Sequence, residues 1–304
     1  MKPKLRMRRQ DVRPNHARGI VLVAVLWLVA SLTLIVSGVL LTLRKEVRQT
    51  ATLRDTLAAS ALADGAIHIA LQSLKAAGAP VSRLQVMETE FSAVRMAVEI
   101  RPLNGLIDLN AAPRDLLAAL LHRAGGMDKA AAVSMADVWV EVRSRRDARG
   151  VPQGIESTED LLGLPGVDYA LYARLKNLVT ADLRGSGRVN PLAAPLEVLW
   201  VLTDGDLARA EQIVTARAAT ALLPDLTGMP PAFVDPQASS LRMQLTVRVP
   251  MEGGFWTHSR WVDLSGNSRE GLPWRTFRTD AWLEPRPAGV DRVVRKMGQS
   301  GAQA

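Results

Sequence analysis

An uncharged apolar run of 24 residues near the N-terminus constrains this chain more than any other feature. It extends from Ile20 to Leu43 and contains only serine, threonine and glycine as mild interruptions. An α-helix of this length reaches roughly 36 Å, which is enough to cross a hydrocarbon core of about 30 Å. Seven cationic residues precede the run, so the positive-inside rule places the N-terminus in the cytoplasm and most of the chain outside. The sequence therefore predicts a protein that spans a membrane once.

The junction in front of this run is abrupt, because Arg18-Gly19 stands directly against Ile20. A secretory signal places its small-residue cleavage site after the apolar segment, and a plain membrane anchor needs no cleavage site. The junction therefore suggests a different kind of processing, at the start of the apolar run.

Net charge and cysteine content restrict which kinds of binding site and cross-link the chain can have. The chain carries +8 in total, with +6 in residues 1–19 and +3 in residues 286–304, which leaves −1 for residues 20–285. By net charge the body of the protein is thus not a basic nucleic-acid surface. The absence of cysteine excludes disulfides and thiolate zinc sites.

Helical spacing of apolar residues continues beyond the apolar run, so we expect one helix from Ile20 to about Ala77. Gly78 and Pro80 then form a stop signal, since glycine tolerates the left-handed cap and proline cannot continue the hydrogen-bond ladder. The alternative is a membrane helix and a separate surface helix joined at Arg44.

Period-two alternation predicts four strands, one around residues 94–100 and three after residue 240, on either side of a long helical section. The predicted fold class is α+β: a pilin-like long N-terminal transmembrane helix and a small antiparallel sheet, with a large all-α insertion of the helix-hairpin-helix or SAM-like kind. The predicted segments are a leader (1–19), a membrane span (20–43), its helical continuation (44–78), a split sheet (79–104 and 236–285), the insertion (105–235) and a flexible basic tail (286–304).

The insertion contains an internal repeat at an offset of 82 residues. The segment from Gly105 to Leu120 aligns with the segment from Gly187 to Leu202, and the shared residues include a glycine, an Ala-Ala-Pro triplet and two leucines. Proline in a first helical turn loses no intrahelical bond. The repeat predicts two related helical subdomains. One departure is that Leu192 stands where the first copy has Asn110.

Signals for catalysis or metal binding are weak. The four histidines do not pair at ligand spacing, and no nucleotide-binding, hydrolase or metalloprotease motif is present. We therefore expect no enzyme and no required cofactor. Carboxylates near the strand ends are candidates for binding calcium, although no ligand set can be assigned from their spacing. These candidates are Glu88, Glu90, Asp263, Asp280 and Glu284.

A helix-hairpin-helix is the sharpest local pattern, with a tight turn at Leu164-Pro165-Gly166 whose amides could meet a phosphate. DNA-binding hairpins have a second glycine where this chain has Asp168, and a carboxylate there repels phosphate. We therefore favour a packing hairpin over nucleic-acid binding. Ser157 and Asp160 have the spacing of a capping box that begins a helix.

Taken together, these features resemble type IV pilin-like proteins, and specifically the general secretion pathway protein K family of type II secretion minor pseudopilins. The resemblance runs from Arg18 to about Leu283. It rests on the leader, on "IDLNAAPRDLL" with Asp108, Asn110 and Pro113, and on "STEDLLGLPGVDYALYARLKNLVT" with its hairpin turn.

This resemblance implies that a prepilin peptidase cleaves after Gly19 and methylates the new amino group of Ile20. It implies an inner-membrane protein with a periplasmic head that assembles with other minor pseudopilins, the major pseudopilin and the inner-membrane secretion platform. Secreted substrates are a further class of partner that the resemblance allows. Pilin-like proteins usually carry glutamate where this chain has Ala24, and this departure implies a position at the tip of the pseudopilus, which the protein would initiate and cap.

Two other classes of protein remain as alternatives. A membrane-anchored helix-hairpin-helix DNA-binding protein of the competence type would need a basic, glycine-rich hairpin. A signal-anchored periplasmic enzyme would need a convergent cluster of catalytic side chains once the strands assemble.

Overall fold

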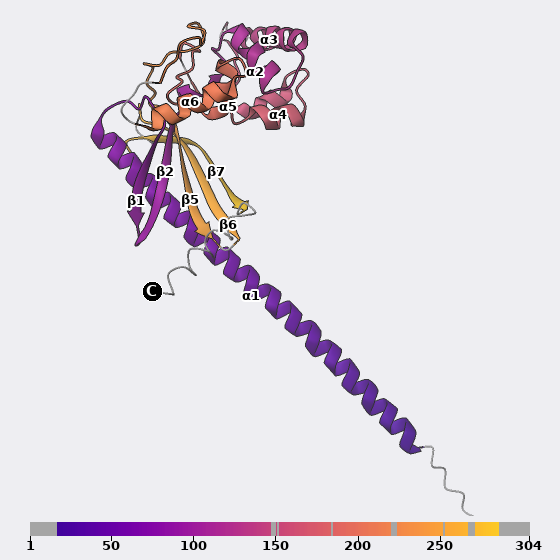
Figure 1. The fold of residues 1–304 in the computed structure, drawn as a ribbon. Coiled ribbons are helices and arrows are strands. Elements are labelled where there is room, and N and C mark those ends of the chain that lie inside the picture. The colour runs from indigo at the N-terminus through magenta and orange to yellow at the C-terminus, as the bar shows by residue number, and fades with distance from the viewer. Residues whose placement is uncertain are drawn as a thin grey trace, which may run out of the picture. The chain divides into compact units, whose positions relative to one another are not determined.

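The computed structural model describes residues 17–146, 150, 152–183, 185–219, 224–251, 253–266 and 271–285, and the side chains of all of these except 17–20 and 38–49. The expected leader before residue 17 and the expected tail 286–304 lie outside this range. Residues 1–58 and 59–304 form two compact units, and each is described by itself. Figure 1 gives the order of the elements along the chain.

Helix α1 runs without a break from Ala17 to Ala77, so the expected continuous helix is confirmed. Gly78 ends it with a φ of +65°, a left-handed conformation that glycine adopts at little cost. The amide of Gly78 donates to the carbonyl oxygen of Lys75 at 3.2 Å. The helix therefore ends at the glycine that the sequence predicted as its stop.

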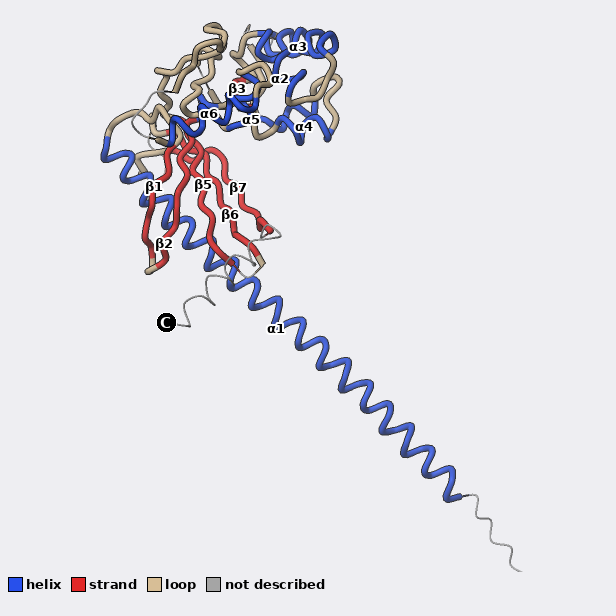
Figure 2. The backbone as a smooth tube through the Cα atoms, in the orientation of Figure 1, coloured by secondary structure: helices blue, strands red, loops and turns tan. Residues whose placement is uncertain are grey.

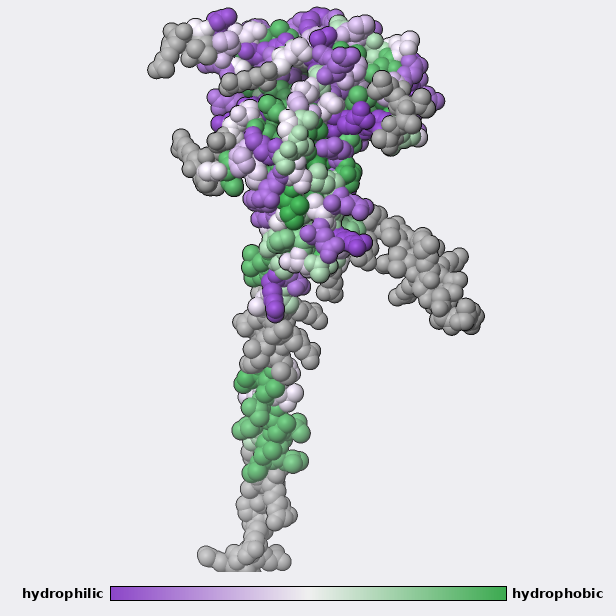
Figure 3. Space-filling model, turned by 90° about the vertical axis from the view of Figure 1, so that its left-hand side faces the viewer, coloured by the Kyte–Doolittle hydropathy of each residue, from purple (hydrophilic) through white to green (hydrophobic). Residues whose placement is uncertain are grey.

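Two stretches of α1 are apolar enough to bear on a membrane span. Thr50–Ala77 is long enough and apolar enough to cross a membrane, with a mean hydropathy of 1.3. Val21–Ser37 is a shorter apolar stretch. Thr50–Ala77 contains Arg54, Asp55 and Asp64, and 39% of its apolar window is buried. Val21–Ser37 contains no charge and its side chains are almost all exposed, as the green surface in Figure 3 shows. We therefore assign most of Thr50–Ala77 to the core of the sheet-containing unit. The predicted membrane span, residues 20–43, includes residue 20 and residues 38–43, whose side chains are not described.

A five-stranded antiparallel sheet has the order β1-β2-β5-β6-β7. Its strands are Gln85–Phe91, Val94–Pro102, Arg242–Met251, Gly254–Asp263 and Arg275–Pro285. The sequence predicted four of these strands and did not predict β1. Its seven residues are mostly exposed and only Thr89 is buried, so an edge strand of this kind leaves little period-two apolar pattern.

One face of the sheet packs against the last five turns of α1. Small residues on the helix allow close approach, and alternate residues of β2 and β5 fill the space between. In Figure 1 the strands lie alongside this end of the helix. The buried residues of this core include Ala63, Ala66, Ile67, Ala70, Leu71, Val98, Ile100, Leu245 and Val247.

The chain between β2 and β5 forms a separate, mainly helical core. Its helices are α2 (Arg114–Arg123), α3 (Lys129–Ser144), α4 (Tyr169–Leu175), α5 (Leu196–Leu202) and α6 (Leu207–Ala218), with 3-10 turns at Leu103–Gly105 and Thr158–Gly163. The prediction of an all-α insertion was wrong in one respect. Two short strands, β3 (Ile107–Asp108) and β4 (Val179–Thr180), pair in parallel inside it, and Figure 2 marks β3 among the helices.

Candidate functional site

The predicted motif residues Asp108 and Asn110 lie at the centre of the helical region, where they join distant loops. Asn110 donates through Nδ2 to the carbonyl oxygens of Ile155 at 2.8 Å and Ala181 at 3.2 Å, and its Oδ1 accepts from the amide of Ile155 at 2.7 Å. One side chain thus fixes two segments that are 45 and 71 residues away. The motif has a structural role that its sequence pattern alone did not reveal.

Asp108 is 3% exposed, and its Oδ1 accepts from the amide of Asn110 at 2.9 Å. In the second repeat Asn190 makes the same turn, accepting from the amide of Leu192 at 2.9 Å. Asp108 Oδ2 is buried without a hydrogen-bond partner in the described structure. Burial raises the pKa of Asp108 to about 6, while the amides of Asn110 and Ala111 and the guanidinium of Arg143 act in the opposite direction.

The two repeats pack against each other reciprocally through their glycines. A Cβ on Gly105 would lie well inside 3.0 Å of the backbone of Ala193, and a Cβ on Gly187 would meet the backbone of Ala111 in the same way. Ala111 and Ala193 are themselves equivalent in the two repeats. This exchange of equivalent contacts is what an approximate two-fold relation between the repeats produces.

The helices that follow begin in the same way in both repeats. Pro113 and Pro195 are the N-cap residues of α2 and α5. Asp128 and Asp206 cap α3 and α6 by accepting backbone amide hydrogen bonds. The two repeats thus share the type of residue that begins each of their two helices.

The predicted hairpin is a packing element in the structure. Leu164 is 8% exposed, Gly166 lies against the side chain of Met135, and Asp168 caps α4 by accepting from the amide of Leu171 at 2.7 Å. The carboxylate of Asp168 therefore occupies the helix end where a phosphate would bind. Asp160 accepts from the amide of Ser157 at 3.0 Å, which confirms the capping box, but the helix it begins is a 3-10 turn rather than an α-helix.

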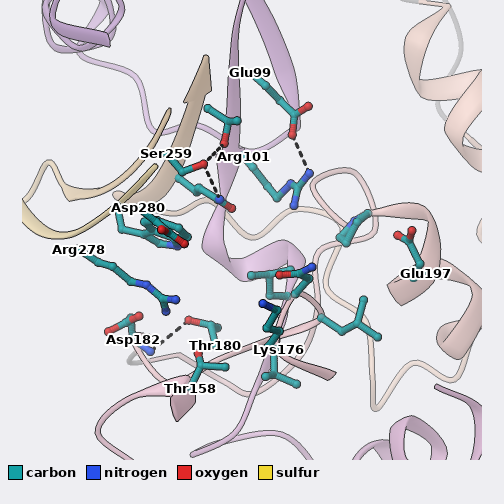
Figure 4. Close-up of a pocket in the computed structure, with 18 of the residues that line it drawn as sticks. Glu99, Arg101, Thr158, Lys176, Thr180, Asp182, Glu197, Ser259, Arg278 and Asp280 are labelled. Carbon is teal, nitrogen blue, oxygen red and sulfur yellow. Dashed lines mark hydrogen bonds and ion pairs between the residues drawn. The ribbon is translucent and has the colours of Figure 1, made fainter. Parts of the chain in front are cut away.

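A groove of about 750 Å³ lies between the outer face of the sheet and the helical region. Its floor contains polar residues of β5 to β7, where Ser259 Oγ and Thr246 Oγ1 are 2.8 Å apart and Thr257 is 1% exposed. Figure 4 shows Asp280 and Ser259 on the sheet side and Thr158, Thr180 and Asp182 on the other side. Sequence reasoning missed this groove, because its lining comes from many elements far apart in the chain.

Aromatic and charged side chains share this groove. Arg278 pairs with Glu159 at 2.8 Å and stacks over the ring of Trp261 at 4.6 Å, and Glu99 accepts from Arg101 at 2.6 Å. Trp200, Trp261, Trp282 and Tyr172 all contribute to the lining. Tryptophan, tyrosine and arginine are the residues that most often dominate protein–protein contacts.

The carboxylates proposed for calcium do not gather at one place. Glu88 and Glu90 lie on β1, at the opposite edge of the sheet from Asp280 and Glu284 on β7. Asp263 is held by Arg242 at 2.9 Å. No group of three acidic, histidine or cysteine side chains suited to a metal is found within the described residues.

A buried histidine at the contact of α1 with the sheet was also not singled out from the sequence. His258 on β6 is 4% exposed, and neither ring nitrogen has a hydrogen-bond partner among the described residues. Its Nε2 lies 3.4 Å from Oδ1 of Asp64, and this oxygen accepts a hydrogen bond from Arg260 at 2.7 Å. Burial lowers the pKa of His258, although the nearby Asp64 acts in the opposite direction.

We expect His258→Met to reduce the acid sensitivity of the head. Because the pKa of His258 is lower in the folded state than its ordinary 6.5, the unfolded chain binds more protons, and stability falls as pH drops below about 6.5. The loss is at most about 1.4 kcal/mol per pH unit. Urea unfolding followed by tryptophan fluorescence at pH 7.5 and 5.5 measures it, and equal losses in both proteins would contradict the assignment.

The chain is similar to solved structures, one of which is described here by its own title. The chain resembles a chain in "The Crystal Structure of the GspK-GspI-GspJ complex from enterotoxigenic Escherichia coli Type 2 Secretion System", with 18% identity, a TM-score of 0.49, and coverage of 79% of this chain and 100% of that chain. No family model and no curated protein matches the chain.

Proposed function

We propose that this protein is a minor pseudopilin of a type II secretion system, anchored once in the bacterial inner membrane with its head in the periplasm. The observation that carries the proposal is the continuity of α1. The helix contains the Gly19–Ile20 junction, continues through the uncharged run, and ends as the helix that packs on an antiparallel sheet. A peptidase cut at Gly19 would leave this whole helix as both membrane anchor and assembly surface.

The exposed apolar side chains of α1 support the assembly part of the proposal. Between Val21 and Val36 the large apolar residues are 50% to 75% exposed. Surfaces this apolar are stable only in lipid or against other helices. In a pseudopilus both are available, because the first helices of neighbouring subunits pack together after leaving the membrane. The partners we propose are the other minor pseudopilins, the major pseudopilin and the inner-membrane platform, and secreted substrates could meet the head.

A position at the tip is the finer part of the proposal. Ala24 lies where pilin-like proteins carry a glutamate that meets the terminal amine of a neighbouring subunit. An unpaired carboxylate is costly in hydrocarbon, and a subunit with no neighbour above it has no amine to offer. The mainly helical region between β2 and β5 adds bulk to the head, which suits a protein that initiates and caps the filament rather than one that is stacked within it.

Neither rival class gains support from the described residues. The end of α4 is occupied by Asp168, and the groove carries acidic and basic residues in equal number, which does not suit a phosphate backbone. We propose no catalytic role and no required cofactor, and calcium remains without assigned ligands.

Mass spectrometry of the N-terminus tests the proposal. The full chain, co-expressed with a prepilin peptidase, should begin at Ile20 with a methylated amino group, and Gly19→Leu should keep its leader. Gly38→Leu is the matched control, because it changes a glycine inside the same helix and should be processed normally. An intact leader on the unmodified chain, or a cut after Leu43, would rule out the pseudopilin assignment.

A further inference from the structure

Strand β7 is an open edge of the sheet. It pairs with β6 through ten residue pairs and has no neighbour on its other side among the described residues. At 11 residues it is the longest of the described strands, and eight of these residues are exposed. Trp282 and Leu283 are 42% and 53% exposed. Long edge strands with exposed apolar residues are sites where another strand can add.

The two faces of β7 have different chemistry. Arg278, Asp280 and Trp282 lie opposite Trp261, Ser259 and Thr257 of β6, and all six line the groove. Thr279, Ala281 and Leu283 lie on the face toward α1 and carry no charge. A strand added to β7 would therefore place every second side chain at the rim of the groove and the others beside the uncharged side chains of Thr279, Ala281 and Leu283.

Of the charged residues on the groove face of β7, Asp280 alone makes no hydrogen bond or ion pair in the described structure, although its charge acts on Tyr172 and His258. Arg278 pairs with Glu159 and stacks on Trp261, and Glu284 accepts from Arg248 and from Thr257 at 3.0 Å each. Opposite charges on directly facing residues stabilise a strand pair, and like charges destabilise it. The open position on this edge thus favours a cation.

We propose that β7 binds an extended segment of a partner polypeptide as a sixth strand, with a lysine or arginine facing Asp280 and uncharged residues on the side toward α1. Backbone hydrogen bonds supply the affinity in this mode of recognition, and alternate side chains supply the specificity. Trp282 provides an aromatic contact for the groove-side residue next to the cation. This surface is distinct from the apolar part of α1, so it does not depend on the processing of the leader.

The absence of cysteine permits a direct test with the full chain in detergent. Ala281→Cys carries an environment-sensitive fluorophore beside the edge, and Val86→Cys on the opposite edge strand β1, where Val86 is 62% exposed, is the control. The probes are nine-residue peptides with valine at every second position, threonine elsewhere, and either lysine or glutamate at the centre. A third peptide repeats the lysine version with N-methylated backbone amides along one edge.

The lysine peptide should shift the fluorescence at position 281 and leave position 86 unchanged. The glutamate peptide should bind about fivefold more weakly, Asp280→Lys should reverse this preference, and the N-methylated peptide should lose binding on its blocked edge. Equal binding of the lysine and glutamate peptides, no response at position 281, or disulfide-linked dimers of the unlabelled Ala281→Cys protein would overturn the proposal, the last by making a second copy the occupant. Leader processing is measured separately, so either proposal can fail alone.

Discussion

Gly105→Ala and Gly187→Ala should each destabilise the helical region by about 3 kcal/mol or more, because each methyl group would enter the backbone of the other repeat. Backbone cannot move aside as a flexible side chain can. Gly187 also has a φ of +75°, which adds a cost of about 1 kcal/mol for any side chain. Urea unfolding followed by tryptophan fluorescence measures both effects, with Trp139 as a buried reporter in this core.

Two other glycines provide matched controls for these variants. Gly163 has open space where a Cβ would be placed, and Gly253 combines open space with a φ of +86°. Gly163→Ala should therefore change stability little, while Gly253→Ala isolates the cost of the left-handed conformation. If Gly105→Ala were as mild as Gly163→Ala, the reciprocal packing of the repeats would be wrong.

Asp108→Asn should raise the free energy of unfolding at pH 7.5 by on the order of 2 kcal/mol. The pKa of Asp108 rises from its ordinary 3.8 to about 6 in the folded protein, so the charged carboxylate is disfavoured by folding. Its contribution to stability is greatest below about pH 4 and is lost as pH rises through about 6. Asparagine keeps the acceptor for the amide of Asn110 and removes the charge, as Asn190 already does in the second repeat.

The pH dependence separates this cause from simple repacking. Subtracting the stability of the variant from that of the unmodified chain at each pH also removes the contribution of His258, which has the opposite slope. The difference between the two proteins should grow between pH 4 and pH 6 and then level off. A difference that is constant from pH 4 to pH 8 would mean that Asp108 does not titrate in this range.

Features set by local chemistry could be predicted from the sequence. The end of α1 at Ala77 follows from Gly78, strand β5 follows from its alternation of apolar and polar residues, and the hairpin turn follows from Pro165-Gly166. The capping box was found in the same way, because its two residues are three positions apart. Such signals depend on a few neighbouring residues, so they survive without knowledge of the fold.

Features that depend on distant partners could not be predicted in the same way. Strand β1 is mostly exposed at the edge of the sheet, and only Met87 and Phe91 are apolar on the face toward α1. The two-residue strands β3 and β4 are too short to show any period. The repeat revealed which residues are equivalent, but not that Gly105 packs on Ala193. The partners of Asn110 lie far along the chain, which no spacing rule indicates.

Asn190 has a consequence for the order in which the chain folds. Its Nδ2 donates to the carbonyl oxygen of Ser82 at 2.6 Å, just before β1, and to that of Ala238 at 2.7 Å, just before β5. The sheet joins β2 to β5 across about 140 intervening residues, and closing so long a loop costs conformational entropy when the loop is unstructured. If the helical region folds first, it reduces the length of unstructured chain between β2 and β5. The side-chain amide of Asn190 then holds together the segments that lead into β1 and β5. The sheet would therefore be completed after the helical region between β2 and β5 has folded.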